Sequence, residues 1–288
     1  MRFKLLGHSG LRVSELCLGA MTFGEEWGWG SSREESRAVF DAYVEAGGNF
    51  VDTANVYTNG TSETLLGQFL EGQREKVVLA TKYTSCMDPD NPNAGGNARR
   101  NMVRAVEASL KRMRTDYIDL YWLHAWDFTT PVEEVMRAFD DLVRAGKVLY
   151  VGVSDTPAWL VSEANMLAEL RGWSRFVGLQ IQYSLISRHA ERELLPMARA
   201  RDIAVTPWGV LGSGMLSGKY RGQVGQQVHS RGEMGDGTLT EHNMRIAEEV
   251  EAVAREHGCS AAQVALAWVR QQPYGVMIPI LGARTVPQ

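Results

Sequence analysis

The 288-residue chain is predicted to adopt an α/β fold, because short apolar runs alternate with amphipathic segments along its length. The apolar runs are rich in β-branched residues, as expected of strands that are buried on both faces of a parallel sheet. Eight such runs can be counted, and no Gly-x-Gly-x-x-Gly turn follows the first of them. These observations favour a (β/α)8 barrel, the TIM-barrel architecture, over an open doubly wound sheet.

The predicted strands occupy residues 49–52, 77–80, 117–123, 148–153, 176–181, 203–206 and 276–280, with Leu16-Cys17-Leu18 as a weaker eighth candidate. Ahead of them, Phe3 to Val13 has the pattern of a β-hairpin, which could plug the bottom of the barrel. Neither a linker nor a low-complexity segment divides the chain, so we expect residues 1–288 to form a single barrel domain.

The segments between the strands predict amphipathic helices. In residues 132–143 the apolar side chains repeat at intervals of three and four and form one stripe. Capping-box pairs are expected to begin three of the helices: Ser32 with Glu35, Thr130 with Glu133, and Ser260 with Gln263. A helix should also cover the eighth strand, but the sequence stops at Gln288, so we expect the last barrel helix to be missing from it.

Composition and charge exclude several classes of protein. The formal net charge of −4 argues against a general nucleic-acid binder. Charged residues interrupt the N-terminal segment, so a signal peptide is not expected, and no apolar run is long enough to span a membrane. The three cysteines are far apart and predict reduced thiols in the cytoplasm: Cys17, Cys86 and Cys259. No residues have the spacing of metal ligands, so no metal site is expected.

Polar or aromatic residues stand at the ends of the predicted strands: Asp52, Lys82, His124, Ser154, Gln180 and Trp208. Tyr57 follows Asp52 by five residues. Each of these residues has an ordinary structural role when it is considered alone. In a barrel, however, the C-terminal ends of the strands form one rim, which is where active sites lie. The constellation therefore predicts an active site.

The segments that contain these rim residues resemble motifs of the aldo-keto reductase family. The run from Gly48 to Tyr57 (GNFVDTANVY) resembles the first motif of that family, Ala-Thr-Lys82 resembles its lysine segment, and 116–124 (DYIDLYWLH) resembles the segment that carries its histidine. Further matching segments follow in family order and cover the chain from Lys4 to Gln288. The segments that begin at Asp155 and Trp208 are closer to the branch with aryl-alcohol dehydrogenases and potassium-channel β subunits.

The resemblance implies NAD(P)H-dependent reduction of a small-molecule aldehyde or ketone, or oxidation of the alcohol. Tyr57 would be the general acid, and the Lys82 ammonium would lower the pKa of its phenol. Asp52 would hold Lys82 in place, and His124 would orient the substrate carbonyl.

The resemblance also implies a cofactor site. Ser154 and Gln180 would hold the nicotinamide carboxamide, and Trp208 would stack on the ring. The pyrophosphate would follow a glycine-rich loop, with a lysine adding charge: Gly209, Val210, Leu211, Gly212, Ser213, Gly214 and Lys219. The adenosine end would face Gly282, Arg284 and Gln288. Arg284 could bind a 2′-phosphate, which favours NADPH, and Arg231 is a weaker second candidate.

Two positions depart from the family pattern. Asp155 stands where many relatives have asparagine, and Val210 replaces a common proline. Trp27, Trp29 and Trp126 lie in loops at the expected mouth and predict an apolar substrate pocket.

Two other functions compete with a carbonyl reductase. One is an NADP-binding redox sensor or partner-binding subunit with slow turnover. The other is a barrel hydrolase or lyase that uses an acid–base pair. Oligomeric state is not predicted.

Overall fold

A computed structural model describes residues 1–218 and 240–288 of the protein. Its central feature is a parallel sheet with the strand order β10-β3-β4-β5-β6-β7-β8-β9. The strands are β3 (Cys17–Gly19), β4 (Phe50–Asp52), β5 (Val78–Tyr83), β6 (Ile118–Leu123), β7 (Val148–Ser154), β8 (Phe176–Gln182), β9 (Ala204–Trp208) and β10 (Ile280–Leu281). The predicted (β/α)8 barrel is therefore confirmed, and each strand overlaps its predicted range.

Residues 276–281 close the barrel by pairing with β9 through their first part and with β3 through their last part. Val205 of β9 donates its amide hydrogen to Val276 O at 2.8 Å, and Ile278 donates to Val205 O at 2.9 Å. Ile280 and Leu281 then pair with β3 on the other side. Pro279 lies between these two contacts and has no amide hydrogen. This break explains why β10 is shorter than the predicted strand at 276–280.

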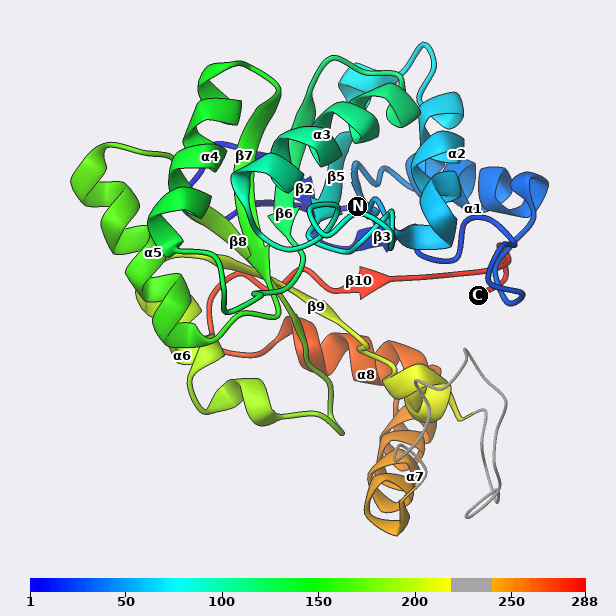
Figure 1. Ribbon diagram of the computed structural model, residues 1–288. Helices are drawn as coiled ribbons and strands as arrows, with labels where there is room; N and C mark the ends of the chain where they lie inside the picture. The colour runs from blue at the N-terminus through cyan, green and yellow to red at the C-terminus, as the bar shows by residue number, and fades with distance from the viewer. Residues whose placement is uncertain (219–239) are drawn as a thin grey trace.

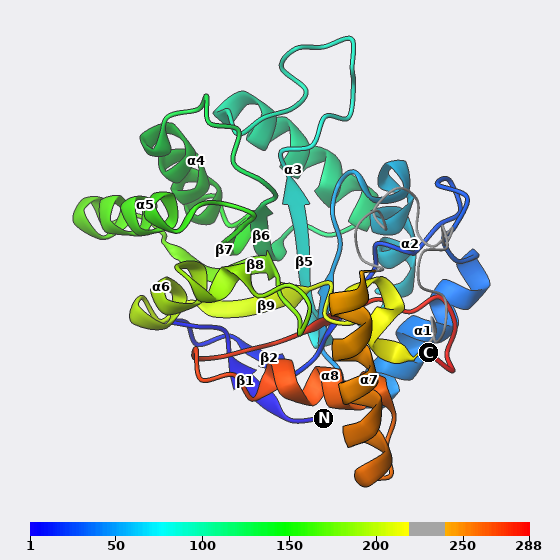
Figure 2. The same cartoon turned by 90° about the horizontal axis from the view of Figure 1, so that it is seen from below.

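Helices surround the strands (Figures 1 and 2). They are α1 (Arg33–Glu45), α2 (Thr61–Phe69), α3 (Arg99–Met113), α4 (Val132–Arg144), α5 (Ala158–Arg171), α6 (Leu194–Ala200), α7 (Glu241–Glu256) and α8 (Ala261–Arg270). The short 3-10 turns are η1 (Tyr57–Gly60), η2 (Arg74–Lys76), η3 (His189–Glu191) and η4 (Gly212–Ser217). Residues 282–288 form turns after β10.

Two of the three predicted capping boxes are present, at Ser32 and at Ser260. The predicted cap at Thr130 is wrong, because α4 begins after Pro131 with no side-chain cap. The Thr130 hydroxyl instead donates to Asp127 Oδ2 at 2.8 Å, and the Thr129 and Thr130 amides donate to Asp127 Oδ1. Together with a hydrogen bond from the Asn97 amide, these bonds lower the pKa of Asp127 to about 2, although partial burial opposes them.

The predicted N-terminal hairpin is also confirmed, since β1 (Phe3–Leu5) pairs antiparallel with β2 (Arg12–Ser14). Its turn closes the N-terminal end of the barrel: Leu6 is fully buried in the cluster inside the barrel. A Cβ on Gly7 would lie 2.4 Å from Val177 O, so the turn presses directly against β8.

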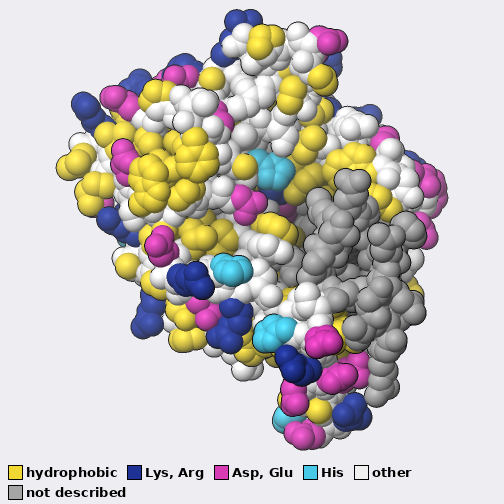
Figure 3. Space-filling model, turned by 60° about the horizontal axis from the view of Figure 1, so that its bottom comes forward, with side chains coloured by type: hydrophobic (Ala, Val, Ile, Leu, Met, Phe, Trp, Pro, Cys, Tyr) yellow, Lys and Arg dark blue, Asp and Glu magenta, His cyan; other side chains and the backbone are white. Residues whose placement is uncertain are grey.

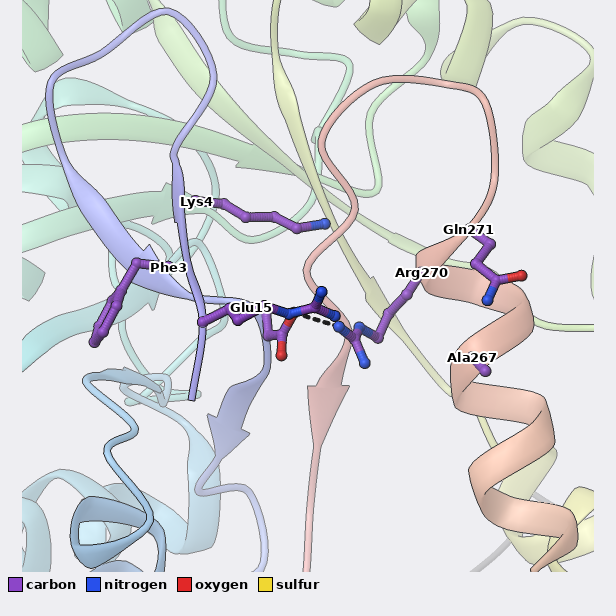
Figure 4. A pocket seen from close by; sticks show the side chains of 7 residues that line it. Phe3, Lys4, Glu15, Ala267, Arg270 and Gln271 are labelled. Atoms are coloured by element: carbon purple, nitrogen blue, oxygen red, sulfur yellow. Dashed lines mark hydrogen bonds and ion pairs between the residues drawn. The ribbon is translucent and has the colours of Figure 1, made fainter. Parts of the chain in front are cut away.

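Ion pairs hold the hairpin against α8 beside a cavity of about 310 Å³ (Figure 4). Glu15 accepts a hydrogen bond from Arg2 at 3.0 Å and another from Arg270 of α8. Lys4 donates to Met277 O at 3.1 Å. Arg2, Lys4 and Arg270 are therefore bonded to groups of the protein itself. The cavity lies at the end of the barrel opposite the predicted rim.

Trp122 fills the barrel interior below the predicted rim. Its side chain is fully buried, and it lies in register with Lys82 on one neighbouring strand and Gly152 on the other. A Cβ on Gly152 would lie 2.3 Å from the indole, and a Cβ on Gly178 would lie 2.8 Å from it. Only glycine leaves room for the indole at these two positions of β7 and β8.

We predict that Gly152→Ala lowers the free energy of unfolding by about 2 kcal/mol, because the added methyl group overpacks the barrel against Trp122. Urea unfolding monitored by circular dichroism measures this change. Gly10→Ala is the matched control, since a Cβ at that position meets no atom within 4 Å. An equal effect of the two substitutions would contradict the packing argument.

Candidate active site

The predicted rim residues meet at the C-terminal ends of the strands. Asp52 ends β4, Ser154 ends β7, and Trp208 ends β9. Lys82 and Gln180 lie near the ends of β5 and β8, and His124 directly follows β6. Residues as far apart in sequence as 52 and 208 therefore share one edge of the barrel.

Lys82 lies at the centre of the site and is fully buried. Its Nζ donates to Asp52 Oδ2 at 2.5 Å, to Thr53 O at 2.8 Å and to the Tyr57 hydroxyl at 3.1 Å. All three donor positions of the ammonium are thus used. Burial by itself lowers the pKa of Lys82, but the charges and hydrogen bonds of Asp52 and Tyr57 outweigh burial and raise it.

Asp52 connects two sides of the barrel. While Oδ2 accepts from Lys82, Oδ1 accepts a hydrogen bond from Gln180 Nε2 at 3.1 Å. Burial raises the pKa of Asp52, and the Lys82 ammonium opposes that rise. The predicted Asp52–Lys82 pair is present, and the link to Gln180 is an additional contact that sequence reasoning missed.

Tyr57 begins the short turn η1 after β4 and is partly exposed. The Lys82 ammonium lies 4.6 Å from the centre of its ring. We expected the ammonium to lower the pKa of the phenol below its usual value. The net direction is the opposite: burial raises the pKa of Tyr57, and Lys82 offsets only part of the rise. The hydroxyl is therefore protonated at neutral pH.

His124 lies beside Tyr57, with ring centres 5.9 Å apart in an edge-to-face arrangement. Burial, together with the nearby positive charge of Lys82, lowers the pKa of His124 to about 3. The imidazole is consequently neutral over the physiological pH range and can hydrogen-bond a polar group without carrying charge.

The glycine-rich loop after β9 has an unusual backbone. Gly209, Gly212, Ser213 and Gly214 all have positive φ, with 55° at Ser213. The Gly212 amide donates to Gly209 O at 2.8 Å and the Gly214 amide donates to Leu211 O at 3.0 Å, so turns within the loop hold this backbone in place. Val210 is buried and Leu211 packs against the core, so the side chains of this loop anchor it.

The end of the chain lies beside the segment that follows β3. Thr22 donates its hydroxyl to Ala283 O at 3.0 Å, and Ser31 donates to Arg284 O at 3.0 Å. Gln288 Oε1 accepts from the Arg284 amide at 2.9 Å, which links two predicted adenosine contacts. Gly282 is exposed next to them. Lys219 and Arg231 lie outside the described residues.

The three predicted substrate tryptophans have different environments. Trp27 lies edge-on to Tyr57, with ring centres 6.2 Å apart, and Trp29 lies 5.5 Å from Trp27. Both are partly exposed. Trp126 is instead buried in the core between the strands and helices. The tryptophan pair is therefore positioned at the site, and Trp126 supports the barrel wall.

Two exposed aromatic residues were missed by sequence reasoning. Phe128 follows β6 in the Asp127 turn and is 69% exposed, while Trp159 in the first turn of α5 is 61% exposed. Phe128 also has a left-handed backbone, with φ 58°. Hydrophobic side chains gather into a broad patch on the face seen in Figure 3. The lengths of the loops that contain Phe128 and Trp159 do not indicate whether these side chains face the core or the solvent.

No group of three or more His, Cys, Asp and Glu side chains that could hold a metal ion occurs in residues 1–218 and 240–288. The three cysteines are free thiols. None of the helices that the structure describes combines the length and hydropathy needed to cross a bilayer.

The lowered pKa of His124 predicts acid-dependent stability. Its unfolded-state pKa lies near 6.5, so below this pH the unfolded chain binds a proton that the folded chain does not, and stability falls toward pH 3. Between pH 6.5 and 5 the loss from this residue should be about 2 kcal/mol. Urea unfolding of the wild-type protein and of His124→Gln over this range measures the difference. Parallel pH dependences of the two proteins would contradict it.

Comparison with known proteins identifies the family. A sequence model of the aldo/keto reductase family matches residues 15–288. Norsolorinic acid reductase stcV of Emericella nidulans is 40% identical over 97% of this chain and 73% of its own length. Aryl-alcohol dehydrogenase (NADP(+)) of Phanerodontia chrysosporium is 38% identical over 96% of this chain and 77% of its own length. The predicted resemblance is confirmed, and this chain belongs to the aldo/keto reductase family of oxidoreductases.

Proposed function

We propose that this protein reduces aldehydes or ketones to alcohols with NADPH, and that Tyr57 is the general acid. The observation that carries the proposal is the position of Lys82, which contacts both Asp52 and Tyr57 beside the neutral ring of His124. The similarity to an aryl-alcohol dehydrogenase named for NADP(+) supports the choice of cofactor.

The residues present fit a nicotinamide cofactor. Ser154 and Gln180 are buried polar side chains at the ends of neighbouring strands, and Gln180 uses its amide nitrogen toward Asp52, which leaves its amide oxygen to accept from a carboxamide. Trp208 offers a partly exposed indole, and glycine in the loop that follows would let the backbone approach a pyrophosphate closely. When bound, the nicotinamide supplies the hydride that reduces the carbonyl carbon.

The protein supplies the proton. Tyr57 donates its phenolic hydrogen to the carbonyl oxygen, and the resulting phenolate is stabilised by the Lys82 ammonium at 3.1 Å. His124 donates a hydrogen bond to the same oxygen and orients the substrate, and its neutral form keeps it from adding charge near Lys82. In the reverse direction the phenolate accepts the proton of the alcohol.

The body of the substrate would lie among aromatic side chains. Trp27 is in edge contact with Tyr57, and Phe128 and Trp159 lie in the segments after β6 and β7. A bound substrate would cover these exposed aromatic side chains and so bury apolar surface on both partners. This arrangement favours carbonyl compounds with an apolar, aromatic body. Trp29 packs on Trp27 and extends that surface.

We predict that Tyr57→Phe lowers kcat/KM for carbonyl reduction by about 10²- to 10⁴-fold, since only the proton donor is removed. NADPH binding, followed by fluorescence, should remain close to that of the wild-type protein. Tyr150→Phe is the matched control, because Tyr150 packs against the cluster inside the barrel. Near-wild-type turnover of Tyr57→Phe would remove this residue from the acid role. Tight NADPH binding without appreciable wild-type turnover would favour the redox-sensor alternative.

We also predict that Arg284→Ala weakens NADPH binding by about ten- to a hundredfold and leaves NADH binding nearly unchanged. The guanidinium can hold a 2′-phosphate through charge-assisted hydrogen bonds, and NADH has no such group. Dissociation constants of both cofactors measure the effect. Arg104→Ala on the exposed surface of α3 controls for the loss of one positive charge. Equal losses for the two cofactors would exclude Arg284 from the phosphate site.

A further inference from the structure

Asp155 contacts two residues of the proposed nicotinamide site, Gln180 and Trp208, and its negative charge has no assigned role in the proposed chemistry. It directly follows β7, and its φ of 38° places a residue other than glycine in the left-handed region. Its amide donates to Gln180 O at 3.2 Å. Its carboxylate oxygen Oδ1 lies 3.4 Å from Trp208 Nε1, which donates to it. Because β8 lies between β7 and β9, the carboxylate reaches across the end of β8 at the rim of the barrel.

The structural roles of Asp155 do not require a negative charge. Asparagine adopts the left-handed conformation as readily as aspartate, and its amide oxygen would accept the hydrogen bond from Trp208 equally well. Backbone strain of this kind is typically retained at functional sites. The property that distinguishes Asp155 from a neutral residue of the same shape is therefore its charge.

The remaining charges of the site cancel. The Lys82 ammonium is paired with the Asp52 carboxylate at 2.5 Å. His124 is neutral because its pKa is lowered to about 3, and Tyr57 is neutral because its pKa is raised. Asp155 is thus the uncompensated charge among these five groups of the described rim.

We propose that Asp155 is a specificity-determining residue that selects neutral aldehydes and ketones over substrates that carry an anionic group near the carbonyl. This inference rests on the proposed carbonyl reductase function and names the charge class of its substrates. An anionic substrate would place a second negative charge beside the carboxylate in a partly desolvated site, and like charges in such positions repel.

The test compares two aldehydes of similar size and different charge. One is 4-formylbenzenesulfonate, which is anionic at every pH used, and the other is the neutral 4-(methylsulfonyl)benzaldehyde. The quantity of interest is the ratio of kcat/KM for the neutral probe to kcat/KM for the anionic probe. Dividing the ratio of the wild-type protein by that of Asp155→Asn removes the intrinsic reactivity of the two aldehydes.

We expect this double ratio to be about threefold to tenfold, a range limited by the solvent exposure of Asp155. Asp202→Asn is the matched control. Asp202 precedes β9 at the opposite end of the barrel and lies 3.3 Å from His8, so the same loss of charge there should leave the double ratio near one. A double ratio near one for Asp155→Asn would overturn the inference while carbonyl reduction stands. Failure of the wild-type protein to reduce either aldehyde would refute the proposed function, and this inference with it.

The pH dependence of the wild-type protein gives a second readout. Partial burial of its carboxylate raises the pKa of Asp155, while Trp208 and Lys82 oppose the rise. Lowering the pH toward this pKa should neutralise Asp155 and reduce the preference for the neutral probe. The preference of Asp155→Asn should stay constant over the same range, in which Lys82 remains charged and His124 remains neutral. A preference that falls equally in both proteins would assign the effect to another group and overturn the role of Asp155.

Discussion

The buried ion pair between Lys82 and Asp52 is the interaction on which the site depends. Removing an ammonium and a carboxylate from water is costly, and the pair is tolerated only if the remaining hydrogen-bonding positions are filled. Here Thr53 O and the Tyr57 hydroxyl complete the ammonium, and Gln180 completes the carboxylate. The same contacts that satisfy the buried charges also fix the phenol, so stability and the proposed chemistry share one network.

The barrel makes this network possible because parallel strands end at one rim. Trp122 fills the barrel interior directly below that rim. Its indole occupies the space left by Gly152 and Gly178, and Ser154 and Gln180 follow these glycines by two residues on the same face of their strands. The indole thus forms a rigid layer directly below the polar residues. The hairpin turn at Leu6 fills the opposite end, so the interior is closed below the site.

The polarity of the rim differs between its two sides. The Trp27 pair approaches Tyr57 from the segment after β3, whereas Asp155 reaches over β8 toward Trp208. An aromatic surface on one side and a carboxylate on the other would discriminate between substrates by different physical effects, the first by burial of apolar area and the second by charge. If the proposed function holds, such a division would let the protein accept varied apolar carbonyl compounds and reject anionic ones.

The sequence by itself determined the order of strands and helices, the hairpin and the residues at the rim, because strand periodicity and strand ends are local properties. The family motifs around Asp52, Lys82 and His124 could also be recognised in the sequence, because each is a short continuous segment. Other features depended on distant groups. Thr130 bonds to Asp127 and α4 begins after Pro131 without a side-chain cap, and Trp126 is buried in the core. The net rise in the pKa of Tyr57 was equally hidden, since it sums the burial by all surrounding elements against one nearby ammonium. Only the tertiary structure decided these outcomes, because competition for a hydrogen bond and loss of water are set by neighbours that the chain brings together from far apart.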